Sequence, residues 1–184
     1  LTWRDVQEIL VHSARKNDPN DSSWTTNGAG HDISHKYGFG AIDAGAAVAL
    51  AESWTTLDTE MNVTYGPFFE YLDIPDDDTT WTEFNLTMPL ELSIESIDVI
   101  LDISHTYRGD LDIVLESPDG TESWLAEDHS DSGDDYSNWL FNTVQHWGES
   151  SLGEWKLKMR DTGSGDNGTL NSWEVIFHGV DIDF

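Results

Sequence analysis

Apolar and polar residues alternate along short segments in the second half of the chain, and this pattern constrains the fold more than any other feature. The alternation runs through residues 97–103, 111–115, 155–159 and 173–177. Because successive side chains of a β-strand point to opposite faces, a period of two predicts strands that bury one face. Turn residues at 117–120, Ser-Pro-Asp-Gly, separate two such segments. We therefore expect a mainly β fold, an antiparallel jelly-roll β-sandwich of about eight strands.

The turn at residues 117–120 also predicts which loops share one end of the sandwich. If residues 111–115 and 121–126 are antiparallel partners, the chain enters the first and leaves the second at the same end. Loops 104–110 and 127–138 then lie close together. Acidic side chains from separate loops can converge there.

The first 56 residues show a different pattern, which predicts two helices and a short hairpin. Thr2 and Asp5 form a capping box in front of an amphipathic helix over residues 1–15. Asp43 is a suitable N-cap for a second helix, AGAAVALAESW, which is apolar nearly all round.

A helix that is apolar all round belongs inside a larger body. Residues 1–54 hold too few large apolar side chains to enclose it. We expect two units, residues 1–56 and 57–184, of which the first is the edge of a larger domain. Without that domain, the two helices are expected to pair with a second copy of the chain.

Acidic residues dominate the charge, which is −28 from 36 acidic and 8 basic side chains. Residues 1–54 hold 7 acids and 4 bases, so the remaining 29 acids and 4 bases fall in residues 55–184. This excess repels nucleic acid and anionic membranes and attracts divalent cations, so we exclude nucleic-acid and membrane partners. Self-repulsion is relieved by screening ions, which predicts a saline or calcium-containing medium.

The chain has no cysteine, which excludes disulfides and thiolate chemistry. Its longest apolar run, residues 41–51, is short and contains Asp43. We therefore expect neither a membrane span nor a signal peptide in this sequence.

Several stretches resemble one family, the kexin- and furin-like subtilases known as proprotein convertases. LTWRDVQEIL at 1–10 and WTTNGAGHDISHKYGFGAIDAGAAVALAESW at 24–54 are similar to the end of the catalytic domain. HTYRGDLDIVLESPDGT at 105–121, the NW-F segment at 138–141 and GEWKLKMRDTGSGDNGTLNSWEVIFHG at 153–179 resemble the P domain. The resemblance implies a β-jelly roll fused directly behind a protease, which it stabilises.

The resemblance also implies that the catalytic residues lie outside this sequence. In the family, the nucleophilic serine stands in a Gly-Thr-Ser motif upstream of the stretch that LTWRDVQ resembles, and the catalytic aspartate and histidine lie further upstream. Without these three groups no hydroxyl is activated for nucleophilic attack. His35 and His105 are candidate bases, but both lie in stretches with structural counterparts in the family, so we expect local structural roles.

We therefore expect the C-terminal part of a secreted, calcium-dependent serine endopeptidase that cleaves after basic residues. Its expected partners are the N-terminal remainder of its own catalytic domain and, through the whole enzyme, a peptide or protein substrate. The expected compartment is extracellular or periplasmic. This part alone is expected to be inactive.

Arg108-Gly109-Asp110 forms an Arg-Gly-Asp triplet, which invites an adhesion interpretation. Adhesion needs a protruding, accessible loop, whereas this triplet leads straight into the strand at 111–115. We expect turn architecture instead, in which the arginine holds a carboxylate or carbonyl groups.

Four acid-rich segments supply the oxygen ligands that calcium prefers. They are residues 73–78, 108–112, 127–135 and 160–168, and none has EF-hand spacing. The predicted calcium ligands are Asp73, Asp76, Asp110, Asp161 and Asp166. The alternative is that these carboxylates accept hydrogen bonds from loop amides or remain in solvent.

The nine tryptophans suggest a second function, because jelly rolls can stack sugars on exposed aromatic rings. Trp155 and Trp173 are predicted to be core residues from their strand parity. Trp124, Trp139 and Trp147 would support a carbohydrate- or protein-binding module if their rings formed an exposed row. Burial of these rings would count against it.

Overall fold

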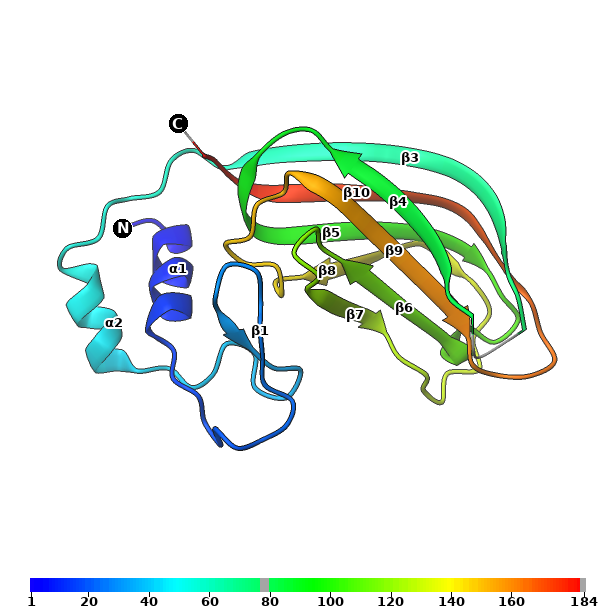
Figure 1. Ribbon diagram of the computed structural model, residues 1–184, viewed down its shortest axis with the longest axis horizontal. Coiled ribbons are helices and arrows are strands. Elements are labelled where there is room, and N and C mark those ends of the chain that lie inside the picture. Colours follow the sequence, from blue (N-terminus) through cyan, green and yellow to red (C-terminus); the bar gives the residue numbers. More distant parts are fainter. Residues whose placement is uncertain (77–79, 183–184) are drawn as a thin grey trace.

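The computed structural model describes residues 1–76 and 80–182, which form a two-layered sandwich flanked by a smaller helical segment (Figure 1). Within these residues the sandwich has two antiparallel sheets of four strands each. One sheet has the order β3-β10-β5-β8, with bounds Met61–Ile74, Gly168–Asp181, Leu92–Ser104 and Tyr136–Thr143. The other has the order β4-β9-β6-β7, with bounds Thr82–Met88, Gly153–Asp161, Leu111–Glu116 and Glu122–Ala126. The predicted β-sandwich is confirmed.

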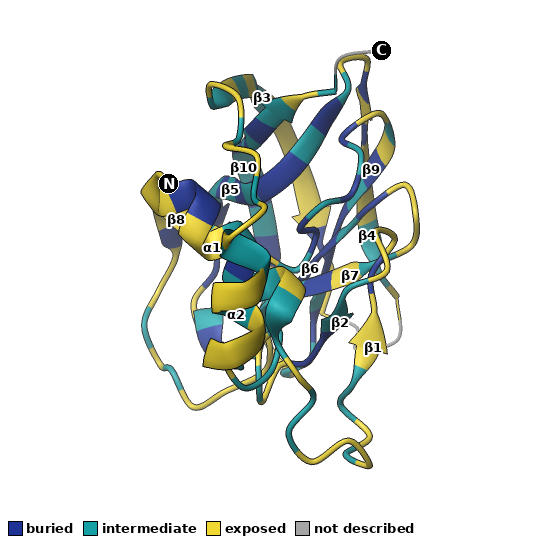
Figure 2. Ribbon diagram, turned by 90° about the vertical axis from the view of Figure 1, so that its left-hand side faces the viewer, coloured by how far each residue is buried: buried dark blue, intermediate teal, exposed yellow. Residues whose placement is uncertain are grey.

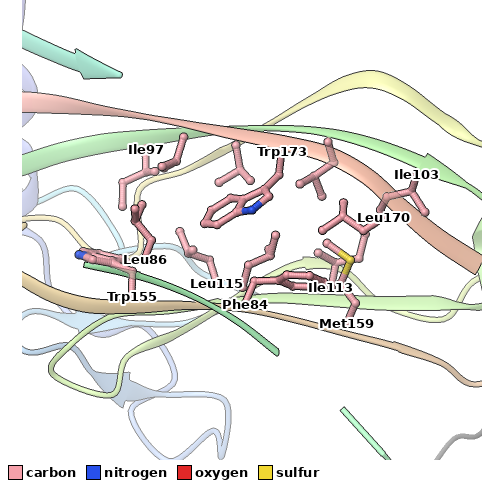
Figure 3. Packing of buried hydrophobic residues seen from close by; sticks show 14 of the residues in the cluster. Phe84, Leu86, Ile97, Ile103, Ile113, Leu115, Trp155, Met159, Leu170 and Trp173 are labelled. Carbon is pink, nitrogen blue, oxygen red and sulfur yellow. The ribbon is translucent and has the colours of Figure 1, made fainter. Parts of the chain in front are cut away.

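The core lies between the two sheets and is filled by the apolar half of the alternating pattern. Alternate residues of β5 are buried, namely Ile97, Val99, Leu101 and Ile103. Trp173 of β10 pairs with Leu101, and its indole ring lies between the two layers (Figure 3). Trp155 is also buried, so the predicted core positions of both tryptophans are confirmed.

Strand β6 departs from a simple alternation because both of its faces are buried. Asp112 and Val114, on the face away from the core, are nearly inaccessible. Their register partners on β9 are Arg160 and Lys158, whose long side chains lie on that same outer face. Arg160 donates from Nε to Asp112 at 2.9 Å, so this buried carboxylate is paired.

The β6–β7 hairpin brings the two predicted loops together. The amide of Arg108 donates to the carbonyl of Gly133 at 2.9 Å, and the amide of Gly109 donates to Asp131 at 3.1 Å. The predicted convergence of loops 104–110 and 127–138 is therefore confirmed.

The N-terminal segment contains helix α1 (Trp3–Ser13), the two-stranded β1–β2 pair (Thr25–Thr26 and Asp32–Ile33) and helix α2 (Ala44–Ala51). Helix α1 begins two residues later and ends two residues earlier than the predicted range. Its capping box is present, with Thr2 as N-cap. The Asp43 carboxylate accepts the Ala46 amide at 2.9 Å and caps α2 as expected.

The two helices contact one another but do not enclose a core of their own. No residue of α2 is buried, and Val48 on this helix is 63% exposed. On α1, Trp3 is 66% exposed, although Ile9 is buried. Figure 2 shows much of the outward surface of α2 as exposed.

No helix in residues 1–76 and 80–182 is long and apolar enough to cross a membrane.

Candidate functional site

The N-terminal segment is attached to the sandwich through polar contacts, and we call this contact region the junction. Its first contact is an ion pair between α1 and β5. Arg4 donates from Nε to Glu95 Oε2 at 2.8 Å and from a second guanidinium nitrogen to Oε1 of the same carboxylate. A third nitrogen donates to the carbonyl of Asp58 at 2.8 Å. Both side chains of the pair are buried, and the bond to Glu95 raises the pKa of Arg4.

Asp5 ties α1 to the chain that leaves α2 for the sandwich. Its Oδ1 accepts the Leu57 amide at 2.8 Å and the Trp54 indole N–H at 3.2 Å. Its other oxygen accepts the amide of Thr2. Desolvation by itself raises the pKa of Asp5, but these bonds to the carboxylate outweigh it and lower the pKa to about 2.

Asn27 connects the end of β1 to the loop between β8 and β9. Its side-chain amide donates to the carbonyl of Gln145 at 3.0 Å and to that of Trp147 at 2.9 Å. Its side-chain oxygen accepts the amides of Ala29 and His31. The residue is buried, so all of these bonds are shielded from water.

Glu149, from the same β8–β9 loop, is a buried carboxylate at the centre of the junction. It accepts the amide of Gly28 at 2.7 Å, the hydroxyl of Thr121 and an imidazole nitrogen of His146 at 3.3 Å. Burial raises the pKa of Glu149, but the bonds from His146 and Thr121 outweigh this and lower it. This carboxylate therefore joins three segments that are far apart in the sequence.

Trp147 closes the junction from the sandwich side. Its ring is buried and meets the ring of Phe39 edge to face, with centroids 6.0 Å apart. Its indole N–H donates to Glu8 of α1. The junction thus combines an aromatic contact with buried polar bonds, while the outward surfaces of α1 and α2 remain apolar and exposed.

At the other end of the sandwich, the Arg-Gly-Asp triplet forms one 3₁₀ turn, Arg108–Asp110. Arg108 donates from Nε to Asp131 at 2.8 Å. Gly109 is buried, and a Cβ atom there would lie 2.3 Å from the carbonyl oxygen of His129. Only glycine fits so close to a neighbouring backbone. The expected turn architecture is present, because the glycine of the triplet is buried and its arginine is paired with Asp131.

All five predicted calcium ligands lie at this same end, where β9 joins β10. Asp73 is exposed on β3 opposite Thr169. Asp76 accepts the amide of Gly165, and Asp161 is buried and accepts that of Gly163. Asp110 and Asp166 complete the set, and residues 77 and 78 of the acidic segment lie outside the described residues.

The environment of Asp110 is electrostatically unfavourable for a carboxylate. Burial and the neighbouring carboxylates, above all Asp161, then Asp128 and Asp166, raise its pKa. No group of three or more histidine, cysteine, aspartate or glutamate side chains in the described chain is arranged to hold a metal ion. A calcium ion here would need backbone carbonyls and water for most of its ligands, and calcium binding stays a prediction.

Comparison with known proteins identifies the sandwich. Residues 94–177 match the proprotein convertase P-domain family. The chain belongs to this family. Furin of Rattus norvegicus and human proprotein convertase subtilisin/kexin type 6 are each 38% identical to it over 98% of its length. The chain spans only 24% of that furin and 20% of the second protein. The family resemblance seen in the sequence is confirmed.

A solved structure shares the fold of both the P domain and the N-terminal segment. The serine protease of Aeromonas sobria matches 97% of this chain with a TM-score of 0.88, and the match covers 40% of that protease. The two sequences are 22% identical, so the likeness establishes the fold. The same protease has been solved in complex with a chaperone.

The tryptophans of the P domain do not form the exposed row that a sugar-binding module was predicted to need. Trp147 is buried in the junction, and Trp124 meets Trp81 edge to face at 6.0 Å. Trp139 is 43% exposed, but the Arg108 guanidinium lies over its ring at 5.1 Å. The carbohydrate alternative is therefore not supported, because the three rings have separate structural contacts.

The two candidate histidine bases have separate environments. His105 is buried in the P domain, and its Nε2 lies 3.1 Å from Asp161. His35 is exposed beside Gln145. The two residues lie at opposite ends of the sandwich, His105 beside the β9–β10 loop and His35 at the junction.

Sequence reasoning missed the buried polar residues of the junction, chiefly Asn27, His146 and Glu149. Asn27 bonds to Trp147, and Glu149 to Gly28, across 120 and 121 residues of sequence, whereas His146 bonds to Glu149 in its own loop. The available signal was a tryptophan between polar residues in the segment QHWGES. An indole in a loop between strands tends to pack on a neighbouring segment, where its N–H needs a hydrogen-bond acceptor.

Proposed function

We propose that this chain is part of a secreted, calcium-dependent subtilisin-like serine endopeptidase. Residues 1–56 would form the C-terminal end of its catalytic domain, and residues 57–184 its P domain. The triad and the substrate pockets, which would accept peptides or proteins and favour cleavage after basic residues, would lie in the remainder. The role of this chain would be to hold that remainder in its folded form.

One observation carries this proposal, namely that the N-terminal segment has two chemically different sides. Towards the P domain it makes the buried bonds of the junction, including Arg4 to Glu95 and Gly28 to Glu149. On its other side it presents exposed apolar groups such as Trp3 and Val48. A catalytic domain that packed on the second side would be connected to the sandwich through the first.

The energetic reason for such support is the burial of apolar surface. Each Å2 of apolar surface removed from water contributes about 25 cal/mol. Folded domains are stable by only about 5–15 kcal/mol, so a few hundred Å2 can decide whether a catalytic domain stays folded. In isolation, the same apolar surfaces of α1 and α2 would promote self-association of this chain.

The experiment removes residues 57–184 from the whole protein, and a milder version changes Glu95→Gln in the intact protein. Both should lower the yield of active enzyme and its Tm. The ratio of kcat/KM between a peptide with a basic residue before the scissile bond and one without should stay the same. An unchanged Tm in the truncated enzyme would overturn the proposal.

The isolated chain tests where the chemistry resides. A serine-reactive fluorophosphonate should label the whole protein but leave residues 1–184 alone unlabelled. Labelling of the isolated chain would contradict the proposed location of the nucleophile.

We also propose that calcium binds beside Asp110. The support is that this carboxylate has its pKa raised by burial and by Asp161, Asp128 and Asp166. A divalent cation would relieve that repulsion. An extracellular or periplasmic medium, saline or rich in calcium, would fit both this site and the overall charge of −28.

A further inference from the structure

A cleft of about 420 Å3 opens between edge strands β7 and β8, away from the junction. Its apolar wall is formed by side chains of both strands, namely Leu125, Ala126, Tyr136, Trp139 and Phe141. Its polar rim consists of Arg108, Glu127, Asp128, His129 and Asp131. We propose that this cleft binds a peptide segment through one cationic side chain, a lysine or an arginine.

The wall of the cleft suits the apolar stem of such a side chain. Tyr136, Trp139 and Phe141 contact one another, with ring centroids between 5.4 and 6.5 Å apart. Trp139 remains 43% exposed despite these contacts. Lysine and arginine side chains bury their methylene groups on such surfaces while their charged ends stay at the rim.

The rim supplies the charge that selects a cation. Three carboxylates face a single guanidinium, and that guanidinium, from Arg108, is already paired with Asp131 at 2.8 Å. The carboxylates of Glu127 and Asp128 are exposed and make no hydrogen bond or ion pair with a described residue. They are therefore available to a ligand, and an anionic ligand would be repelled.

The protein itself shows that this wall accepts a guanidinium. Arg108 lies over Trp139 at 5.1 Å and over Tyr136 at 5.8 Å from the ring centroids. Cation–π contacts of this kind favour arginine and lysine over neutral side chains. A ligand cation would occupy the opposite side of the cleft, beside Glu127 and Asp128.

The cleft also lies far from the N-terminal segment. Helix α1 begins, and β10 ends, at the end of the molecule opposite to the β7–β8 loop that carries the rim (Figure 1). Helices α1 and α2 lie at that same far end (Figure 1), and they carry exposed apolar side chains such as Trp3 and Val48. A catalytic domain attached there would leave the cleft open, so this inference does not depend on the proposed function.

The test measures binding of two fluorescent pentapeptides by anisotropy. Both are leucine peptides with a single central residue, arginine in one and its uncharged isostere citrulline in the other. The arginine peptide should bind about fivefold more tightly at low salt, because its charge pairs with the carboxylates of Glu127 and Asp128. The difference should shrink as salt is raised.

Protein variants locate the binding. Glu127→Gln with Asp128→Asn should weaken binding of the arginine peptide at least about fivefold and leave the citrulline peptide unchanged. The matched control, Glu70→Gln with Asp181→Asn, removes the same charge from exposed positions outside the cleft and should change binding less than twofold.

Two results would overturn the proposal. Equal binding of the arginine and citrulline peptides would show that the cleft does not recognise the cation. Equal weakening by the rim variant and by its control would show only general attraction to an acidic protein.

Trp139→Ala should also weaken binding, and Leu140→Ala on the same strand should not. The rim variant keeps the test valid if loss of the tryptophan unfolds the protein.

Discussion

At the level of single residues, the surroundings of Asp110 oppose the charge of its carboxylate. Its pKa is raised from 3.8 by burial first and then by Asp161, Asp128 and Asp166. A group with a raised folded pKa stabilises the protein below its unfolded pKa, and this contribution is lost as the pH rises through the folded pKa. In calcium-free buffer, Asp110→Asn should therefore raise the Tm at pH 7 by roughly 1–3 °C. It should also flatten the fall in Tm above about pH 4.

Calcium should reverse the order of the Tm values, so that the unmodified protein becomes more stable than Asp110→Asn. Excess calcium should raise the Tm of the unmodified protein, because a ligand that binds only the folded state stabilises it. Asp110→Asn should lose most of that gain, whereas Glu70→Gln on β3 should keep it. Thermal unfolding with and without a chelator measures both effects. An equal calcium gain in all three proteins would place the ion elsewhere or show only screening.

Among the elements, α1 depends on the sandwich through Arg4 and Glu95. Loss of one member of a buried ion pair typically costs about 3–5 kcal/mol, because the other charge stays buried and uncompensated. Glu95→Gln should therefore lower the free energy of unfolding by about 3 kcal/mol and the Tm by roughly 6–12 °C. Arg4→Met should have a similar effect. Urea unfolding, together with hydrogen exchange of the α1 amides, measures it.

A double variant separates the ion pair from the rest of the helix. Arg4→Met combined with Glu95→Met should cost clearly less than the two single changes added together, because it leaves no buried charge behind. Lys36→Met, at the exposed pair with Asp21, is the control and should cost less than about 1 kcal/mol. Strict additivity of Arg4→Met and Glu95→Met would show that the two side chains are not coupled.

The elements differ in how far the sequence could predict them. The period of two from Ile97 to Ile103 predicted a strand and its buried face, because both follow from local geometry. Thr2 and Asp5 predicted the start of α1 for the same reason. Asn27 and Trp147 could not be paired from the sequence, because nothing local specifies which of two distant loops will meet. The sequence likewise showed acid-rich segments, one of which contains Asp110, but it did not give the distances between their carboxylates in the fold.

At the level of the whole molecule, acidic side chains greatly outnumber basic ones. Thirty-six acidic side chains face eight basic ones, and residues 55–184 hold 29 of the acids. Some of the basic side chains form ion pairs with buried carboxylates, for example Arg4 with Glu95 and Arg160 with Asp112. Most carboxylates have no cation available, so repulsion between them outweighs attraction at low ionic strength.

Salt should therefore stabilise this protein. Raising sodium chloride from about 10 mM to 1 M shortens the Debye length from about 30 Å to about 3 Å and screens repulsion between exposed carboxylates. Buried pairs such as Arg4–Glu95 are screened much less. We expect the Tm to rise by about 5 °C, and by less in Glu70→Gln with Asp181→Asn, as differential scanning calorimetry would measure. Sucrose, which stabilises folded proteins because it is excluded from their surface, should raise the Tm of the unmodified protein and of this variant equally. A Tm that falls with salt would mean that attractive surface pairs, and not repulsion, dominate the electrostatic energy of the fold.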